Sequence, residues 1–225
     1  MPNPPPHILT FVTQKGGSGK TTLCTNLAVA AEHEGGRALI LDLDPQGSAE
    51  AWYQDREALQ PRLVRVDAAD LPRALAIAAD QGFTQVFIDT PGRDEPAVAA
   101  AVRAADFCLV PCRPTPPDMK AQPATVATIR RLGKPYAFIL NQTPPRGFRI
   151  REAQAGLLVL GPVAPIAIVA RSVFQDAHGA GQSVLEFEPE GKAAADIRAL
   201  WQWIARRLEK LTDDPQAHFA RGPAA

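Results

Sequence analysis

The stretch that decides the fold reads Gln14-Lys15-Gly16-Gly17-Ser18-Gly19-Lys20-Thr21-Thr22. It follows an apolar run at 7–13 and opens a helical pattern, the context that a phosphate-binding loop requires. Glycines let successive backbone N–H groups turn toward one centre, and the N-terminus of the next helix adds partial positive charge. The pattern predicts a site in which Lys20 reaches the β- and γ-phosphates and the Thr21 hydroxyl coordinates Mg²⁺.

The loop departs from the common pattern G-x-x-x-x-G-K-[ST] in one position. Gln14 stands where that pattern has glycine, and an additional lysine, Lys15, opens the loop. The dinucleotide fingerprint G-x-G-x-x-G fails, because a match that starts at Gly17 ends on Thr22. The residues expected to contact nucleotide are Gly16, Gly17, Ser18, Gly19, Lys20, Thr21 and Thr22.

Short apolar runs alternate with longer helical patterns along the whole chain. The runs expected to form strands are 7–13, 37–42, 62–67, 85–90, 106–111, 136–141 and 162–169. The helical patterns are 21–34, 48–59, 71–81, 95–104, 120–132, 149–158 and 193–211. Most of the strand runs are continuously apolar, as in strands buried on both faces of a parallel sheet. The sequence predicts one doubly wound α/β domain over 1–225, with a mostly parallel sheet and a core of about 7–211.

Acidic and amide side chains close several of the expected strands. Asp42 and Asp44 stand two residues apart at a strand end, so both can face one Mg²⁺–phosphate centre. They could equally cap a turn. Asp89 follows the apolar residues 86–88 and is the acid expected to bind Mg²⁺ through its water shell. Asn141 ends the run at 136–141, where it could also be an ordinary turn residue.

The loop KGGSGKTT together with the segments LDLDPQG at 41–47 and VFIDTPG at 86–92 resembles the ParA/MinD family of dimeric ATPases. The resemblance implies a deviant P-loop NTPase that uses ATP and Mg²⁺. It implies that Lys15 crosses a dimer interface to the partner's nucleotide and that Asp44 orients or activates the attacking water. It also implies that Asp42 lies near the metal and that Asn141 reads the adenine base.

Segments 110–118 and 170–194 resemble the small partition ATPases within this family. That branch implies a homodimer when ATP is bound, non-specific DNA binding, and a ParB-like or adaptor protein that stimulates hydrolysis. The cargo could be a plasmid, a chromosome region or a protein assembly. Many relatives carry a second arginine shortly after the position of Arg171, whereas this chain has Phe174.

Charge is divided unevenly along a chain whose formal net charge is zero. Residues 1–112 hold 9 Lys/Arg and 14 Asp/Glu, and residues 113–225 hold 15 and 10. The segment from Met119 to Arg151 contains no acid. This segment and the cluster Arg206, Arg207 and Lys210 are the candidate DNA contacts, although the charges could also scatter over solvated loops.

Other functions remain open at this stage. A membrane-bound positioning ATPase would need a basic, apolar anchor, which the final residues DDPQAHFARGPAA do not resemble. No apolar run reaches the roughly 18 residues of a membrane helix, and no signal peptide is visible, so we expect a cytoplasmic, nucleoid-associated protein with frayed ends. An iron–sulfur redox role would need suitably placed cysteines, of which Cys112 is the candidate. A small-molecule ATP-dependent ligase would need a dedicated substrate pocket.

Overall fold

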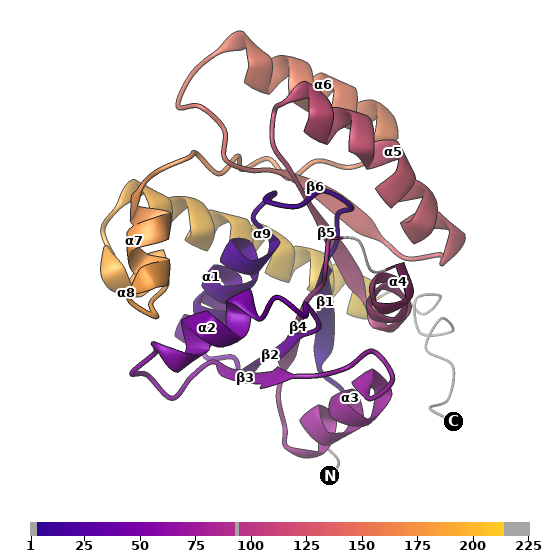
Figure 1. Ribbon diagram of the computed structural model, residues 1–225, viewed down its shortest axis with the longest axis vertical. Helices are drawn as coiled ribbons and strands as arrows, with labels where there is room; N and C mark the ends of the chain where they lie inside the picture. The colour runs from indigo at the N-terminus through magenta and orange to yellow at the C-terminus, as the bar shows by residue number, and fades with distance from the viewer. Residues whose placement is uncertain (1–3, 93–94, 214–225) are drawn as a thin grey trace.

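A six-stranded sheet lies at the centre of the molecule, and every strand runs parallel to its neighbours (Figure 1). The computed structural model describes residues 4–92 and 95–213. The strands are β1 (His7–Phe11), β2 (Ala38–Asp42), β3 (Arg62–Arg65), β4 (Gln85–Asp89), β5 (Phe107–Cys112) and β6 (Tyr136–Leu140). Their order is β3-β2-β4-β1-β5-β6. The predicted doubly wound α/β fold is confirmed.

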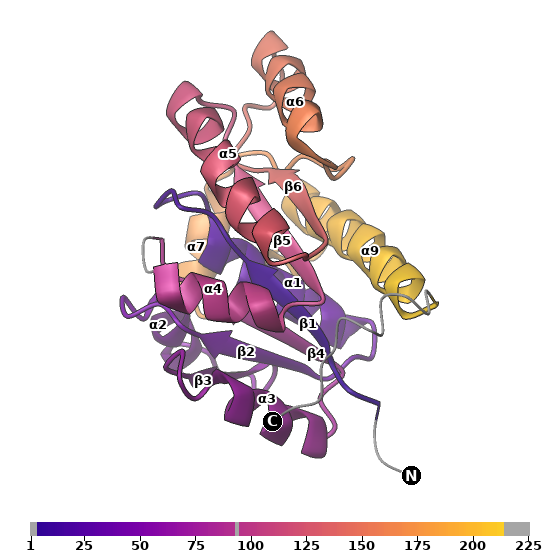
Figure 2. The ribbon, with the colours of Figure 1, turned by 90° about the vertical axis from the view of Figure 1, so that its right-hand side faces the viewer.

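Helices cover both faces of the sheet (Figures 1 and 2). One face carries α1 (Lys20–His33), α2 (Ser48–Gln54), α7 (Val173–Gly179), α8 (Val184–Phe187) and α9 (Lys192–Asp213). The other face carries α3 (Leu71–Asp80), α4 (Glu95–Ala104), α5 (Pro116–Arg131) and α6 (Phe148–Leu160). Every residue of β2, β5 and β6 is buried, which is why these strands read as unbroken apolar runs.

The winding of the chain places the site. After β1 the chain crosses to β2 through α1 on one face, and after β4 it crosses to β5 through α4 on the other. Ligands of such sheets bind at the carboxyl ends of the strands, where the direction of winding reverses. The phosphate loop follows β1 there, and Asp42 and Asp89 end two adjacent strands in register with each other.

The expected strand at 162–169 is wrong. This segment makes only two isolated bridges, Phe138 with Val163 and Thr143 with Val169. It still runs along the outer edge of β6 and exchanges backbone hydrogen bonds with it. Pro162 and Pro165 have no N–H to donate, so a continuous ladder cannot form.

Several helix boundaries also differ from the expectation. The helix expected over 48–59 ends at Gln54, because the Arg56 side chain then turns to bind Glu186 and two backbone carbonyls. Helix α5 begins at Pro116 instead of 120, with Thr115 accepting a hydrogen bond from the Asp118 N–H as its cap. Helices α7 and α8 were not expected. The expected fraying concerns residues 1–6 and 213–225, of which 1–3 and 214–225 lie outside the described part.

Candidate nucleotide site

A cavity of about 800 Å³ opens at the carboxyl ends of the central strands. Among the residues that line it are the whole phosphate loop from Lys15 to Thr22, the turn 44–46, Pro91, Gly92, Gln142 and His178. The structure therefore brings Lys15, Lys20, Thr21 and Asp44 together around one space. Of the sequence-predicted residues, Asp42, Asp89 and Asn141 do not line this cavity, and each has another position that is described below.

The loop is shaped by two glycines in the left-handed region. Gly17 has φ +73°, and Gly19, the residue before α1, has φ +90°. A Cβ on Gly19 would lie 2.3 Å from Nδ2 of Asn141, so only glycine fits. The first turn of α1 carries no acidic residue. Its free backbone N–H groups and partial positive charge are thus available to an anion.

Lys20 supplies a largely buried cation to this cavity, with only 7% of its surface exposed. Burial lowers the pKa of Lys20 from its usual 10.5, and the carboxylates of Asp89 and Asp44 oppose that shift. A buried ammonium that has lost most of its water is poised to gain from a phosphate group.

Asp89 is the buried acid of the site. Its Oδ2 accepts a hydrogen bond of 2.6 Å from the Thr21 hydroxyl, and its Oδ1 has no hydrogen-bond partner. Burial raises the pKa of Asp89 to about 7; Asp42 adds to this shift, and the Thr21 hydroxyl opposes it. A carboxylate in this position gains from a nearby cation, because the cation favours its charged form.

Asp42 and Asp44 do not face one centre in the same way. Both oxygens of the buried Asp42 accept backbone N–H groups, those of Asp44 at 2.9 Å and Glu50 at 3.2 Å. Asp42 thereby fixes the turn into α2. Asp44 lines the cavity and accepts a hydrogen bond from the Gln46 N–H. Asp44 is the acid placed to meet a ligand, and a metal role for Asp42 stays a prediction.

The residues present fit a magnesium ion. Mg²⁺ prefers oxygen ligands and usually keeps several waters, so one or two protein oxygens beside a phosphate suffice. Thr21 Oγ1 and Asp89 Oδ1 are such oxygens, and the latter is buried without a hydrogen-bond partner. Within residues 4–92 and 95–213 no cluster of three or more His, Cys, Asp or Glu could hold a metal unaided. Thr21 and Asp89 could hold such an ion beside a bound phosphate.

A second cavity of about 390 Å³ adjoins the first. The two share Thr22, Gln142 and His178, and the second is further lined by Asn141 and by residues 168–171, 174 and 175. A ligand with phosphates in the first cavity can extend past these shared residues into the second. Asn141 lines this second cavity, and its Nδ2 donates to the Ser18 carbonyl at 2.8 Å. Its contact with an adenine base stays a prediction.

Sequence reasoning missed Gln142 and His178. Gln142 has φ +50°, the single positive φ among the described non-glycine residues, and such strain often marks a functional position. His178 lies half-buried on α7, its Nδ1 is buried without a hydrogen-bond partner, and burial lowers its pKa. Neither residue belongs to the loop motif.

The pattern Ser183-x-x-Glu186, a capping box in the structure, could have revealed helix α8.

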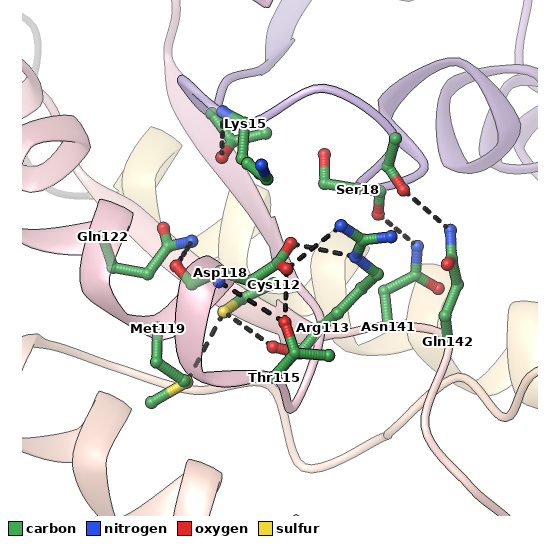
Figure 3. Close-up of polar contacts among 12 residues, drawn as sticks. Lys15, Ser18, Cys112, Arg113, Thr115, Asp118, Met119, Gln122, Asn141 and Gln142 are labelled. Atoms are coloured by element: carbon green, nitrogen blue, oxygen red, sulfur yellow. Dashed lines mark hydrogen bonds and ion pairs between the residues drawn. The ribbon is translucent and has the colours of Figure 1, made fainter.

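The proline-rich segment after β5 lies beside the phosphate loop (Figure 3). Arg113 forms a paired ion bridge to the buried Asp118, with Nε–Oδ1 at 3.0 Å and Nη2–Oδ2 at 3.1 Å. Its Nη1 would lie 3.8 Å from a Cβ on Gly17. Cys112 is buried with its Sγ 3.7 Å from the Met119 sulfur. The segment thus places the Arg113 guanidinium next to the loop at Gly17.

The cysteines do not form a cluster-binding set. All three are free and buried, and burial raises the pKa of both Cys108 and Cys112 to about 12. A cluster held between two copies needs accessible thiolates. The structure therefore gives the iron–sulfur interpretation no support.

Comparison with known proteins agrees with this geometry. The family model described as the CobQ/CobB/MinD/ParA nucleotide binding domain matches residues 9–178. The chain belongs to this family. It is 32% identical over 197 residues to the maintenance of carboxysome distribution protein A of Halothiobacillus neapolitanus, covering 84% of this chain and 91% of that protein. It is also 32% identical over 210 residues to the protein of the same name from Gloeobacter kilaueensis, covering 91% and 95%.

Solved structures show the same fold. The septum site-determining protein MinD of Pyrococcus horikoshii, complexed with Mg-ADP, superposes with a TM-score of 0.74 at 19% identity. The match covers 92% of this chain and 97% of that one. The predicted membership of the ParA/MinD family is confirmed. Separately, none of the helices in the described ranges is long and apolar enough to span a bilayer.

Proposed function

We propose that this chain is a ParA-type ATPase that positions a cargo. ATP with Mg²⁺ closes a sandwich dimer, the dimer binds DNA without sequence preference, and a partner protein stimulates hydrolysis to release it. The two relatives at 32% identity are named for the distribution of carboxysomes, which favours a protein assembly over a plasmid or chromosome region as the cargo.

The observation that carries the proposal is the presence of two lysines and an acid around one cavity. Lys20 suffices for the phosphate contact of an ordinary loop. Lys15, at the mouth of the same cavity, adds a second cation, and Asp44 adds a carboxylate free to face a ligand. A cation supplied from a second copy would stabilise negative charge on the transferring phosphoryl group.

Each side chain then has a definite role. The loop N–H groups and Lys20 hold the phosphates, while Thr21 and Asp89 hold Mg²⁺. The ion offsets charge on the phosphate oxygens. Asp44 orients the attacking water, and Lys15 reaches the nucleotide bound to a second copy of the chain. The ATP triphosphate thereby becomes part of the dimer interface, which makes dimerisation depend on the state of the nucleotide.

The DNA surface is proposed on the basic helices. The acid-free segment contributes six exposed basic residues on or beside α5 and α6: Lys120, Arg130, Arg131, Arg146, Arg149 and Arg151. Helix α9 contributes three more, which are Arg206, Arg207 and Lys210. Figure 2 shows α6 and the carboxyl end of α9 at different places on the molecule. Non-specific binding needs only such Lys/Arg contacts to backbone phosphates.

The decisive experiment measures binding to random-sequence duplex DNA without nucleotide, with ADP and with ATP–Mg²⁺, at two salt concentrations. Dimerisation is followed in parallel by light scattering. We expect DNA binding only by the ATP dimer, and binding should weaken steeply with salt. DNA binding that ignores nucleotide, or an ATP complex that stays monomeric, would contradict the mechanism.

Two lysine variants separate binding from dimerisation. Lys20→Ala should abolish ATP binding, because it removes the buried cation of the loop. Lys15→Ala should still bind ATP but remain monomeric, with ATP hydrolysis reduced by about 10³-fold or more. Calorimetry and light scattering on the same samples check both. A normal ATP-dependent dimer of the Lys15 variant would refute the role in trans.

The same experiment distinguishes the alternatives. An ATP dimer that ignores DNA but binds anionic lipid vesicles would indicate a membrane-associated positioning ATPase. An ATP complex that stays monomeric and hydrolyses ATP only with a small-molecule acceptor would indicate a ligase.

A further inference from the structure

Two consecutive amide side chains after β6 hold two consecutive carbonyls of the phosphate loop (Figure 3). Asn141 Nδ2 donates to the Ser18 carbonyl at 2.8 Å, and Gln142 Nε2 donates to the Gly17 carbonyl at 3.2 Å. The first of these hydrogen bonds is buried and the second is exposed. The loop is thus fastened across 123 positions of sequence, since the residues of the first hydrogen bond are that far apart.

The direction of these bonds determines where the loop N–H groups point. In a trans peptide the C=O and the following N–H point in opposite directions. Because the carbonyls of Gly17 and Ser18 face the amides, the N–H groups of Ser18 and Gly19 face away from them. Ser18 and Gly19 both line the 800 Å³ cavity, so the two hydrogen bonds fix the orientation of peptide groups that border the proposed phosphate position.

The backbone around the two amides is built to hold this arrangement. The Asn141 N–H bonds the Cys112 carbonyl, and the Thr143 N–H bonds the Ile168 carbonyl. Gln142 lies between these fixed points with φ +50°, a left-handed conformation that is unfavourable for a non-glycine residue. On the other side, Gly19 has no Cβ, and a Cβ there would meet Asn141 Nδ2 at 2.3 Å and Gln142 Nε2 at 3.3 Å.

We infer that Asn141 and Gln142 are positioning residues that hold the phosphate loop in its binding shape before nucleotide arrives. This inference rests on the proposed function and changes the role of Asn141. Its amide acts on the phosphates through the loop, in addition to any contact with a base. Both residues also line the second cavity, so the same pair joins the base end of the site to the phosphate end.

A probe without a base tests the inference. Calorimetry with Mg²⁺ compares ATP, GTP and inorganic tripolyphosphate on the wild type and on Asn141→Ala. We expect the affinity for tripolyphosphate to fall about three- to tenfold for one lost hydrogen bond, and the affinity for ATP to fall by at least the same factor. Gln142→Ala removes the exposed bond and should cause a smaller loss for both ligands.

Measurements without ligand provide a second readout. In the nucleotide-free protein, Asn141→Ala should lower the ¹⁵N order parameters of Gly17, Ser18 and Gly19 relative to wild type. Gln202→Ala is the matched control, because Gln202 is exposed on α9 and lines neither cavity. It should leave tripolyphosphate affinity and the loop order parameters unchanged.

The overturning result is specific. If Asn141→Ala loses discrimination between ATP and GTP while tripolyphosphate affinity and loop order stay as in wild type, Asn141 reads the base only. If Asn141→Ala does not fold, Gln142→Ala alone decides, by the same two readouts. A wild type that binds neither ATP nor tripolyphosphate refutes the proposed function itself, which keeps the two failures distinct.

Discussion

At the scale of single residues, three aspartates with similar sequence settings have different surroundings. Both carboxylate oxygens of Asp42 accept hydrogen bonds from backbone N–H groups, and Asp44 lines the cavity. Asp89 has one buried oxygen without a hydrogen-bond partner. The difference comes from where each residue lies relative to the strand ends. Asp42 and Asp89 are the last residues of adjacent strands, whereas Asp44 lies in the turn that follows β2. Hydrogen-bond partners, more than residue type, therefore decide which acid is available to a metal or a water.

The raised pKa of Asp89 predicts that the stability of the nucleotide-free protein depends on pH. Its pKa is raised from 3.8 to about 7, so the unfolded chain releases this proton at lower pH than the folded protein does. Without nucleotide, the Asp89 contribution to stability should therefore fall as pH rises from about 4 to 7. Asp89→Asn should remove this slope and raise the free energy of unfolding at pH 8 by up to roughly 4 kcal/mol. Urea unfolding across this pH range measures it.

The same variant should lose the stabilisation that Mg²⁺ with nucleotide gives to the wild type, because the amide is a weaker metal ligand than a carboxylate. If Asp89→Asn is more stable than the wild type without ligand but is no longer stabilised by Mg²⁺ with nucleotide, Asp89 is a buried acid that serves binding at the expense of stability. If the free energy of unfolding depends on pH in the same way in the variant and the wild type, the burial of Asp89 does not affect stability.

At the scale of elements, helix α2 connects the Asp44 turn to helix α8. Its N-terminus is fixed by Asp42, and its Trp52 donates from Nε1 to the Gln182 carbonyl at 3.0 Å. Beyond its end, Arg56 stacks on the Trp52 ring with 4.9 Å to the centroid and pairs with Glu186 on α8 at 2.6 Å. The Arg56 side chain is only 3% exposed. The turn that carries Asp44 is thus fastened to α8.

Arg56→Ala should destabilise the fold by about 2–3 kcal/mol, because it removes the buried guanidinium and leaves the partly buried Glu186 carboxylate with only its hydrogen bonds from Ser183. Arg65→Ala is the matched control: its pair with Glu50 is exposed on both sides and should contribute less than about 1 kcal/mol. Chemical denaturation of both variants measures the difference. Equal losses would show that the Arg56 pair is no stronger than a surface one.

At the scale of the whole molecule, charge and shape separate two functions. The phosphate site occupies the carboxyl edge of the sheet, while the exposed basic residues of the acid-free segment lie along α5 and α6 on one face. Zero net charge conceals this division. Under the proposed function, dimerisation would link the nucleotide site at the edge to the proposed DNA surface on the helices.

Arg149→Ala with Arg151→Ala tests this surface. If both arginines contact DNA phosphates, the slope of log K against log salt for the ATP dimer should decrease by about 2. Arg62→Ala is the control, since Arg62 is exposed on β3 at the far edge of the sheet. Fluorescence anisotropy at several salt concentrations gives the slopes. An unchanged slope in the double variant would move the surface to the α9 cluster.

The sequence sufficed for the parallel α/β fold and for the residues of the loop. Buried strands must be continuously apolar, and a loop that turns N–H groups toward phosphate must be rich in glycine, so both leave local patterns. The errors lie where distant contacts dominate. The segment 162–169 has the composition of a strand but is limited by its prolines, and the end of α2 is set by an arginine that binds across 130 positions.

The sequence by itself therefore determined the fold class, the phosphate loop and the three aspartates near it, because each depends on neighbours within a few residues. Only the tertiary structure decided which aspartate faces the cavity, that Gln142 and His178 join two cavities, and that Asn141 holds the loop. Those properties depend on which strand ends lie side by side and on where side-chain hydrogen bonds are satisfied. Contacts of that kind form between segments far apart in the chain and leave no local pattern to read.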